Sequence, residues 1–125
     1  LRQEMMKLIS FQRASEWTAG RARAARALGR PPGSEGSIGK LAVSEIARRC
    51  NHVHSMISGA TAMLKETDDP IDAVIAEVLV STPAQSIAGG TDEIQHNILG
   101  ENMLGLPKEP AVDRGMPFRD VGKGN

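Results

Sequence analysis

The sequence predicts an all-α fold, an antiparallel helical bundle of about four helices. Apolar residues recur three or four positions apart along most of the chain, which is the spacing that places them on one face of a helix. Aromatic side chains number only three, so aliphatic side chains and methionine must fill the core, and these suit packed helices. The one run that favours a strand is Val78-Leu79-Val80.

The first half of the chain predicts two long helices. Residues 1–28 form the first, and the run Gly29-Arg30-Pro31-Pro32-Gly33 ends it in a loop. The second helix is capped by Ser34 or Ser37 and runs to about Leu64. The apolar faces are expected at Met5, Leu8, Ile9, Trp17, Ala24 and Leu28 in the first helix, and at Ile38, Leu41, Ile46, Val53, Met56, Ile57 and Met63 in the second.

Two further helices are predicted after a polar break. Asp69 is expected to cap the third helix, about residues 70–88, with Pro70 at its first position and a kink at Pro83. The fourth helix runs from 91 to about 104. The inward positions are expected to be Ile71, Val74, Ile75, Val78, Leu79 and Ile87 in the third helix, and Ile94, Ile98, Leu99 and Met103 in the fourth.

These helices predict the domain organisation. Residues 1–106 are expected to form the bundle, and residues 107–125, rich in glycine and charge, an extended or disordered tail. Leu1 stands in the middle of a helical pattern, without a methionine before it. We therefore expect the chain to be the C-terminal piece of a larger protein, with the first part of the bundle missing.

The composition excludes several classes of partner. Fifteen basic and fifteen acidic residues cancel, so bulk charge indicates neither nucleic acid nor an anionic membrane. The arginines of the first helix are expected to form a solvated face or subunit contacts. No apolar run reaches the roughly 18 residues that span a bilayer, and no signal peptide is visible. The lone Cys50 fits a cytoplasmic protein without an internal disulfide. His52 and His54 face different ways on a helix, so no metal site is predicted.

The most informative segment is Gly89-Gly90-Thr91-Asp92-Glu93-Ile94-Gln95, which opens the fourth helix. Glycine lets the backbone approach a ligand without a side chain in the way. Thr91 is placed to cap the helix, and Asp92 and Glu93 form an acidic first turn. Such a helix start directs free backbone N–H groups and a partial positive charge at whatever lies in front of it. The pattern therefore predicts a ligand-facing turn.

The string from Gly89 to Pro110 closely resembles the C-terminal signature of the acyl-CoA dehydrogenases, flavoenzymes that desaturate acyl thioesters. The resemblance covers residues 34–110 and is strongest over 85–110. It implies the C-terminal helical bundle of that family, FAD as cofactor, and oxidation of an acyl-CoA to the 2-enoyl-CoA. It also implies dimers or tetramers of self or homologous subunits that hold each FAD between them, with an electron-transfer flavoprotein or oxygen as electron acceptor.

The resemblance implies roles for the residues of this turn. Gly89 and Gly90 would lie at the substrate, where the Gly89 N–H would donate to the thioester carbonyl together with a ribityl hydroxyl of FAD. Thr91, Asp92 and Glu93 would lie against the adenosine side of FAD. There Thr91 would donate its hydroxyl, and Glu93 would accept from a ribose hydroxyl or an adenine amine.

No catalytic residue is expected within this chain. Gly89 occupies the position where the family often has the glutamate that removes the α-proton, and glycine has no side chain to do so. Asp92 and Glu93 point away from Gly89, because successive helical residues are rotated by about 100°. Their place at a positive helix end also favours the ionised form and makes them weaker bases. The base is therefore expected upstream of Leu1, and the chain alone is expected to be inactive.

A second match begins at Ser37-Ile38-Gly39-Lys40 and resembles the start of the family's next-to-last long helix. An ungapped count places the family's flavin-contacting Gln-x-x-Gly-Gly on residues 56–60, where only Gly59 is retained. Met56 cannot donate the hydrogen bond of that glutamine to the flavin of a neighbouring subunit, and we expect it in the core. His96 stands where arginine is common in the family, which removes a fixed positive charge.

Two other functions stay open. Gly89 without a carboxylate and Met56 without an amide also fit a catalytically silent partner subunit, one that completes a flavin site in a hetero-oligomer. A free-standing helical interaction module would instead fold as a soluble monomer without FAD.

Overall fold

The computed structural model describes residues 1–64, 68, 70–108, 110 and 115–121. The elements, in chain order, are α1 (Arg2–Ala27), α2 (Glu35–Ser58), the short 3-10 helix η1 (Gly59–Met63), α3 (Pro70–Ser81), the 3-10 helix η2 (Thr82–Ser86), α4 (Asp92–Asn102) and η3 (Phe118–Asp120). No strand occurs among these residues, so the predicted all-α fold is confirmed.

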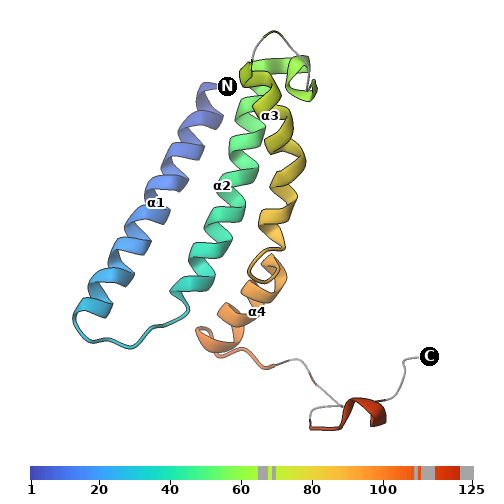
Figure 1. Cartoon of the computed structure of the whole chain (residues 1–125). Coiled ribbons are helices and arrows are strands. Elements are labelled where there is room, and N and C mark those ends of the chain that lie inside the picture. The colour runs from blue at the N-terminus through green and yellow to red at the C-terminus, as the bar shows by residue number, and fades with distance from the viewer. Residues whose placement is uncertain (65–67, 69, 109, 111–114, 122–125) are drawn as a thin grey trace.

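Helix α2 is the central element of the arrangement. Figure 1 shows α1 and α3 running antiparallel to α2 on its two sides, with α4 following α3 beside the beginning of α2. The contacts between elements agree, since α2 touches α1, α3, α4 and both neighbouring 3-10 helices. The start of α4 therefore packs on a long, continuous helix.

Glycine and proline follow the end of the first helix, as predicted. Gly29, the residue after the C-cap Leu28, adopts a φ of +76°, and two prolines follow it in the loop. Helix α2 begins after Ser34, although the Ser34 side chain makes no capping bond. The expected continuous helix to Leu64 is wrong, because Gly59 turns to a φ of +62° and the chain continues as η1.

The predicted kink in the third helix takes a different form. Helix α3 starts at Pro70 as expected and ends at Ser81, after which the chain tightens into η2. Pro83 has no N–H to continue the α-helical ladder. The hydroxyl of Thr82 instead donates to the Val78 carbonyl oxygen at 2.8 Å. The predicted cap Asp69 lies outside the described residues.

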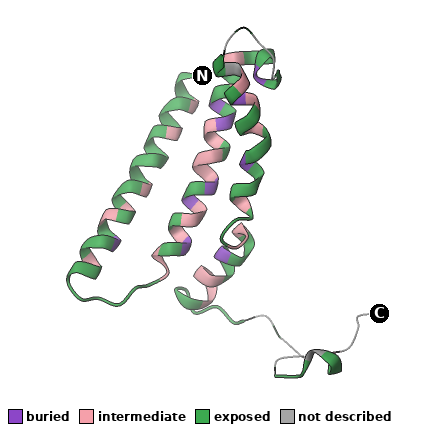
Figure 2. Ribbon diagram, viewed as in Figure 1, coloured by how far each residue is buried: buried purple, intermediate pink, exposed green. Residues whose placement is uncertain are grey.

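The core is small and built from small side chains (Figure 2). The buried apolar residues are Ala22, Ala42, Val53, Ala62 and Ile75, and the buried polar ones are Ser37, Ser44, Asn51, Thr82 and Gln95. Several residues expected to point inward do not, since the exposed fraction is 70% for Trp17, 43% for Met56, 51% for Ile94 and 55% for Met103. In the described part of the chain, α1, α3 and α4 pack against α2 from one side each, so each leaves an apolar face uncovered, and Met56 lies on a side of α2 that these helices do not cover.

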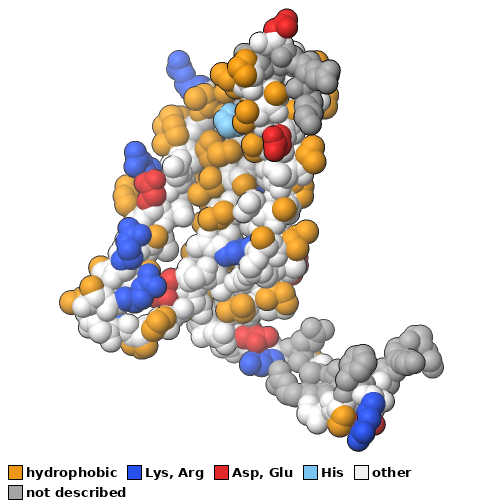
Figure 3. Space-filling view, viewed as in Figure 1, with side chains coloured by type: hydrophobic (Ala, Val, Ile, Leu, Met, Phe, Trp, Pro, Cys, Tyr) orange, Lys and Arg blue, Asp and Glu red, His pale blue; other side chains and the backbone are white. Residues whose placement is uncertain are grey.

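Apolar side chains are consequently spread over the outside of the helices (Figure 3). No helix in the described ranges combines the length and the apolar character needed to cross a membrane. The prediction of a tail over residues 107–125 stays a prediction, and its described part contains the single turn η3.

Candidate functional site

Thr91 caps the N-terminus of α4, as its position in the sequence predicts. Thr91 has extended backbone angles, φ −62° and ψ 159°, and its hydroxyl oxygen accepts a hydrogen bond from the Ile94 N–H at 3.3 Å. Its carbonyl oxygen accepts the first helical bond, from the Gln95 N–H at 3.0 Å. This is the geometry of an N-cap, and it fixes the direction in which the preceding turn leaves the helix.

The preceding turn requires both of its glycines. Gly89 and Gly90 adopt φ values of +70° and +94°, which residues with a side chain rarely adopt. The buried Gln95 reaches back from α4, and its amide nitrogen donates to the Gly89 carbonyl oxygen at 3.0 Å. A Cβ at Gly90 would stand 2.9 Å from that amide nitrogen, whereas a Cβ at Gly89 would meet no atom within 4 Å.

The bond from Gln95 also orients the free donors of the turn. In a trans peptide the C=O and N–H groups point in opposite directions, so the Gly90 N–H faces away from Gln95. Among the hydrogen bonds of the described residues, none uses the N–H of Gly89 or of Gly90. Gly89 is exposed. The turn therefore offers two backbone donors at an accessible edge, in front of a helix N-terminus.

Helix α2 holds the residues on either side of this turn. Lys40 donates from Nζ to the Ser86 carbonyl oxygen at 3.1 Å and pairs with Asp92 Oδ1 at 2.6 Å. Arg48 pairs with Asp92 Oδ2 at 2.9 Å and donates to the Ser86 hydroxyl at 2.7 Å. Between them, the fully buried Ser44 donates its hydroxyl to the Gln85 carbonyl oxygen at 2.9 Å. We call Lys40, Ser44 and Arg48 the α2 polar stripe.

The two acids of the first turn have different surroundings. The hydrogen bonds from Lys40 and then Arg48 hold the pKa of the Asp92 carboxyl far below its usual range. The pKa of the exposed Glu93 carboxyl is also lowered, first by its own backbone N–H and then by the Thr91 hydroxyl. Both groups are therefore ionised near neutral pH and accept protons poorly.

The structure places the predicted site residues of this segment in two environments. Gly89, Gly90, Thr91 and Glu93 lie together at the turn, where Gly89 and Glu93 are exposed and the other two are half-buried. The Asp92 side chain is only 13% exposed, with each oxygen bonded to a cation of α2, so it faces the interior of the chain. That these residues contact substrate or FAD stays a prediction.

The second predicted match lies apart from the turn. Gly59 ends α2 at the opposite end from α4 (Figure 1), and Met56 lies one turn before it. The expectation that Met56 is a core residue is wrong, since 43% of it is exposed. One copy of the chain does not bring these residues to the Gly89 turn, and the resemblance in fact assigns them to the flavin of a neighbouring subunit.

Sequence reasoning missed Gln95, Ser44 and Arg48 as parts of the site. The available signal was the spacing of Lys40, Ser44 and Arg48, which recur every four residues and so form a polar line on a helix with an apolar face. Nothing in the sequence says which carboxylate such a line faces.

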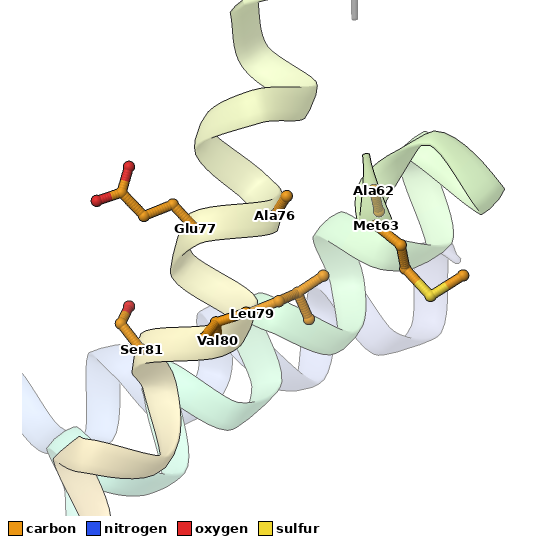
Figure 4. Close-up of a pocket in the computed structure, with 7 residues that line it drawn as sticks. All are labelled: Ala62, Met63, Ala76, Glu77, Leu79, Val80 and Ser81. Atoms are coloured by element: carbon orange, nitrogen blue, oxygen red, sulfur yellow. The ribbon is translucent and has the colours of Figure 1, made fainter. Parts of the chain in front are cut away.

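Other candidate groups are separate from the turn. Burial raises the pKa of the Cys50 thiol, which disfavours the reactive thiolate. No cluster of three histidine, cysteine or acidic residues among the described residues could hold a metal ion. An apolar groove of about 560 Å³ lies between η1 and α3, where Met63, Leu79 and Val80 line it (Figure 4). It contains no residue of the Gly89 turn.

The comparison with protein families identifies the group to which this arrangement belongs. The family model described as "Acyl-CoA dehydrogenase, C-terminal domain" matches residues 1–104. That range includes α1 to α4, the Gly89 turn and the α2 polar stripe. No curated protein and no solved structure matches the chain.

Replacement of Gly90 by alanine is expected to destabilise the chain by about 1–3 kcal/mol. The new Cβ would displace the Gln95 amide and would have to adopt a φ of +94°. Thermal or urea unfolding measures the effect. Gly39→Ala is the control, because its Cβ would meet no atom within 4 Å on α2, and we expect it to be neutral or stabilising by up to about 1 kcal/mol. Equal effects of the two changes would contradict the described turn.

Acid is expected to remove the stabilisation that Asp92 provides. Because its pKa is lower in the folded than in the unfolded chain, the stabilisation is fully present above the ordinary aspartate pKa of about 4 and is lost as the pH falls below it. Asp92→Asn should lower the melting temperature at pH 7, and the difference from the native chain should shrink on acidification. Melting curves between pH 7 and pH 2 test this.

Glu16→Gln is the matched control for the acid experiment. It breaks the pair with Arg13, in which both side chains are about half exposed or more, so it should change the melting temperature little at any pH. Melting temperatures of the native and Asp92→Asn chains that fall in parallel would refute the role of Asp92.

Proposed function

This chain belongs to the acyl-CoA dehydrogenase family, and we propose that its full-length parent is a FAD-dependent enzyme that desaturates an acyl-CoA at the α,β position. The observation that carries the proposal is the pair of free N–H groups at the exposed Gly89 and the half-buried Gly90, which lie in front of the Thr91-capped helix α4. A carbonyl oxygen that gains negative charge is stabilised by such preorganised backbone donors.

Each residue of the turn has a distinct part in this proposal. The Gly89 N–H donates to the thioester carbonyl oxygen and stabilises the charge that develops there as the α-proton leaves. The Thr91 hydroxyl oxygen accepts from Ile94, and its proton, which also stabilises the Glu93 carboxylate, would turn to the adenosine side of FAD. The exposed, ionised Glu93 accepts from a ribose hydroxyl or an adenine amine. When bound, FAD supplies the acceptor for the β-hydride.

The residues present fit this assignment in part. The turn is free of side chains at Gly89, where a Cβ would meet nothing within 4 Å, so a flat thioester can approach the backbone. Asp92, which the resemblance also assigned to FAD, would contribute only indirectly, because Lys40 and Arg48 occupy both of its oxygens. We therefore propose that Asp92 supports the turn and that Thr91 and Glu93 make the cofactor contacts.

The proton acceptor is proposed to lie upstream of Leu1. Gly89 has no side chain, and the two acids that follow in the sequence are held in their weakly basic, ionised form. Neither is suited to take a carbon-bound proton, because a general base works best with a pKa near the operating pH. This chain would thus supply polarisation and cofactor contacts, and another lobe would supply the base.

Gly89 also favours a second function, that of a catalytically silent partner subunit. A subunit that lacks the usual carboxylate at position 89 and carries Met56 in place of an amide could complete the flavin site of another chain without reacting itself. Assembly with self or a homologous subunit is supported by the uncovered apolar faces of the helices, which include Trp17 and Val80 at 70% and 84% exposure.

The proposal predicts that the full-length protein binds FAD and reacts with acyl-CoA. Purified with any co-expressed partner, it should show flavin absorbance, and titration with acyl-CoAs of different length and branching should bleach that absorbance with one class. Thr91→Val should weaken FAD binding, whereas the control Thr91→Ser, which keeps the hydroxyl, should not. Absence of flavin, or flavin that no acyl-CoA bleaches, would count against the enzyme.

Position 89 distinguishes the enzyme from the silent subunit. In an enzyme with an upstream base, both Gly89→Glu and Gly89→Ala should lower kcat/KM by about tenfold or more, since each places a side chain at φ +70° where the thioester approaches. In a silent subunit, the full-length protein should be inactive, and Gly89→Glu alone should gain acyl-CoA oxidation. The alanine variant carries the same backbone strain without a carboxylate and is the control. Steady-state kinetics with a series of acyl-CoAs of different length and branching measures both.

A further inference from the structure

The α2 polar stripe bridges two places in the chain that flank the Gly89 turn. Before the turn in the sequence, the stripe bonds to Gln85 and Ser86 at the end of η2. After the turn, it bonds to Asp92, the first residue of α4. The five residues 87–91 between these anchors contain the free N–H groups and both positive φ angles. Both ends of the segment are therefore tied to one rigid helix.

Two of the three stripe residues, Lys40 and Ser44, make these bonds in largely buried surroundings. The side chains of Lys40 and Asp92 are 15% and 13% exposed, and Ser44 is 0% exposed. Charges this far from water depend on their partner, because removal of one leaves the other poorly solvated. Arg48 is different, since 47% of its side chain is exposed and it also pairs with Glu45 at 3.1 Å. Arg48 can therefore be changed with less risk to folding.

The stripe also neutralises the negative charge of Asp92 beside the Gly89 turn. An unpaired Asp92 carboxylate at the first position of α4 would oppose the positive end of the helix and would repel a developing negative charge in front of it. With Lys40 and Arg48 on its two oxygens, that carboxylate is neutralised and turned toward α2. The free N–H groups of the turn thus keep their positive potential.

We propose that Lys40, Ser44 and Arg48 are positioning residues for the Gly89 turn, which fix both of its ends on α2 and so hold the Gly89 and Gly90 N–H groups in the orientation that the reacting carbonyl needs. This inference rests on the proposed function. None of the three residues touches substrate or cofactor in it, and they act through Ser86 and Asp92. A stripe that merely stabilises the bundle would make the same bonds, so the test must measure more than stability.

The test uses the full-length protein with bound FAD. Lys40→Met removes the bonds to both anchors, Arg48→Gln removes the more exposed half of the pairing, and Lys40→Arg restores a cation. We expect the first two variants to lower kcat by about 10- to 100-fold with KM changed less than about threefold, because a small displacement of the donors weakens transition-state contacts. Lys40→Arg should recover most of the loss. The kcat of each variant is calculated per molecule that contains FAD.

Hydrogen exchange supplies the independent readout. The Ile87 and Ala88 N–H groups bond to the Ala84 carbonyl oxygen, and those of Ile94 and Gln95 bond to Thr91, so exchange over residues 84–96 reports the order of the turn. Lys40→Met and Arg48→Gln should accelerate exchange there at least tenfold. The control Glu16→Gln, which breaks an exposed pair on α1, should alter neither exchange nor kcat.

Each result decides the proposal. Unchanged kcat in folded Lys40→Met and Arg48→Gln proteins would overturn it, and so would a fall in kcat without faster exchange over residues 84–96. If Lys40→Met does not fold, Arg48→Gln decides in the same way. If the unaltered protein holds no FAD and oxidises no acyl-CoA, the proposed function fails. The anchoring of the turn is then judged on exchange alone, and unaltered exchange in Arg48→Gln would reject it.

Discussion

The double pairing of Asp92 with Lys40 and Arg48 is the interaction on which the rest of the site depends. It joins the first residue of α4 to the middle of α2, and the same two cations reach Ser86 at the end of η2. The fold has few large apolar contacts to do this work, because its buried apolar residues are mostly alanine. Polar bonds across a partly buried seam therefore set where α4 begins.

The local features of the site were predictable because they depend on neighbours in the sequence. A threonine before two acids and an apolar period indicates an N-cap, so the cap at Thr91 was predicted correctly, and the glycine pair before it permits the positive φ angles that the structure shows. Helix starts at Pro70 and after Ser34 follow from the same kind of signal. Each of these features depends on residues only a few positions away in the sequence.

The features that sequence reasoning missed are those that depend on tertiary neighbours. Lys40 and Asp92 are 52 positions apart, and a charged residue on a helix is ordinarily solvated, so nothing local indicates that this pair is 15% and 13% exposed. The apolar period of Ile94 and Met103 predicted burial, but the described elements leave about half of each residue exposed. The helix ends at Ser58 and Ser81 were missed because a 3-10 turn follows each helix with a similar spacing of apolar residues, so that spacing alone does not separate the two.

The reach of Gln95 to the Gly89 carbonyl oxygen has a consequence for selectivity. It leaves the main chain, with no side chain, as the surface that the Gly89 turn presents. Main-chain amides recognise an oxygen acceptor and are indifferent to the remainder of the molecule that carries it. If the turn binds the thioester as proposed, discrimination among acyl groups of different length or branching would come from walls built elsewhere.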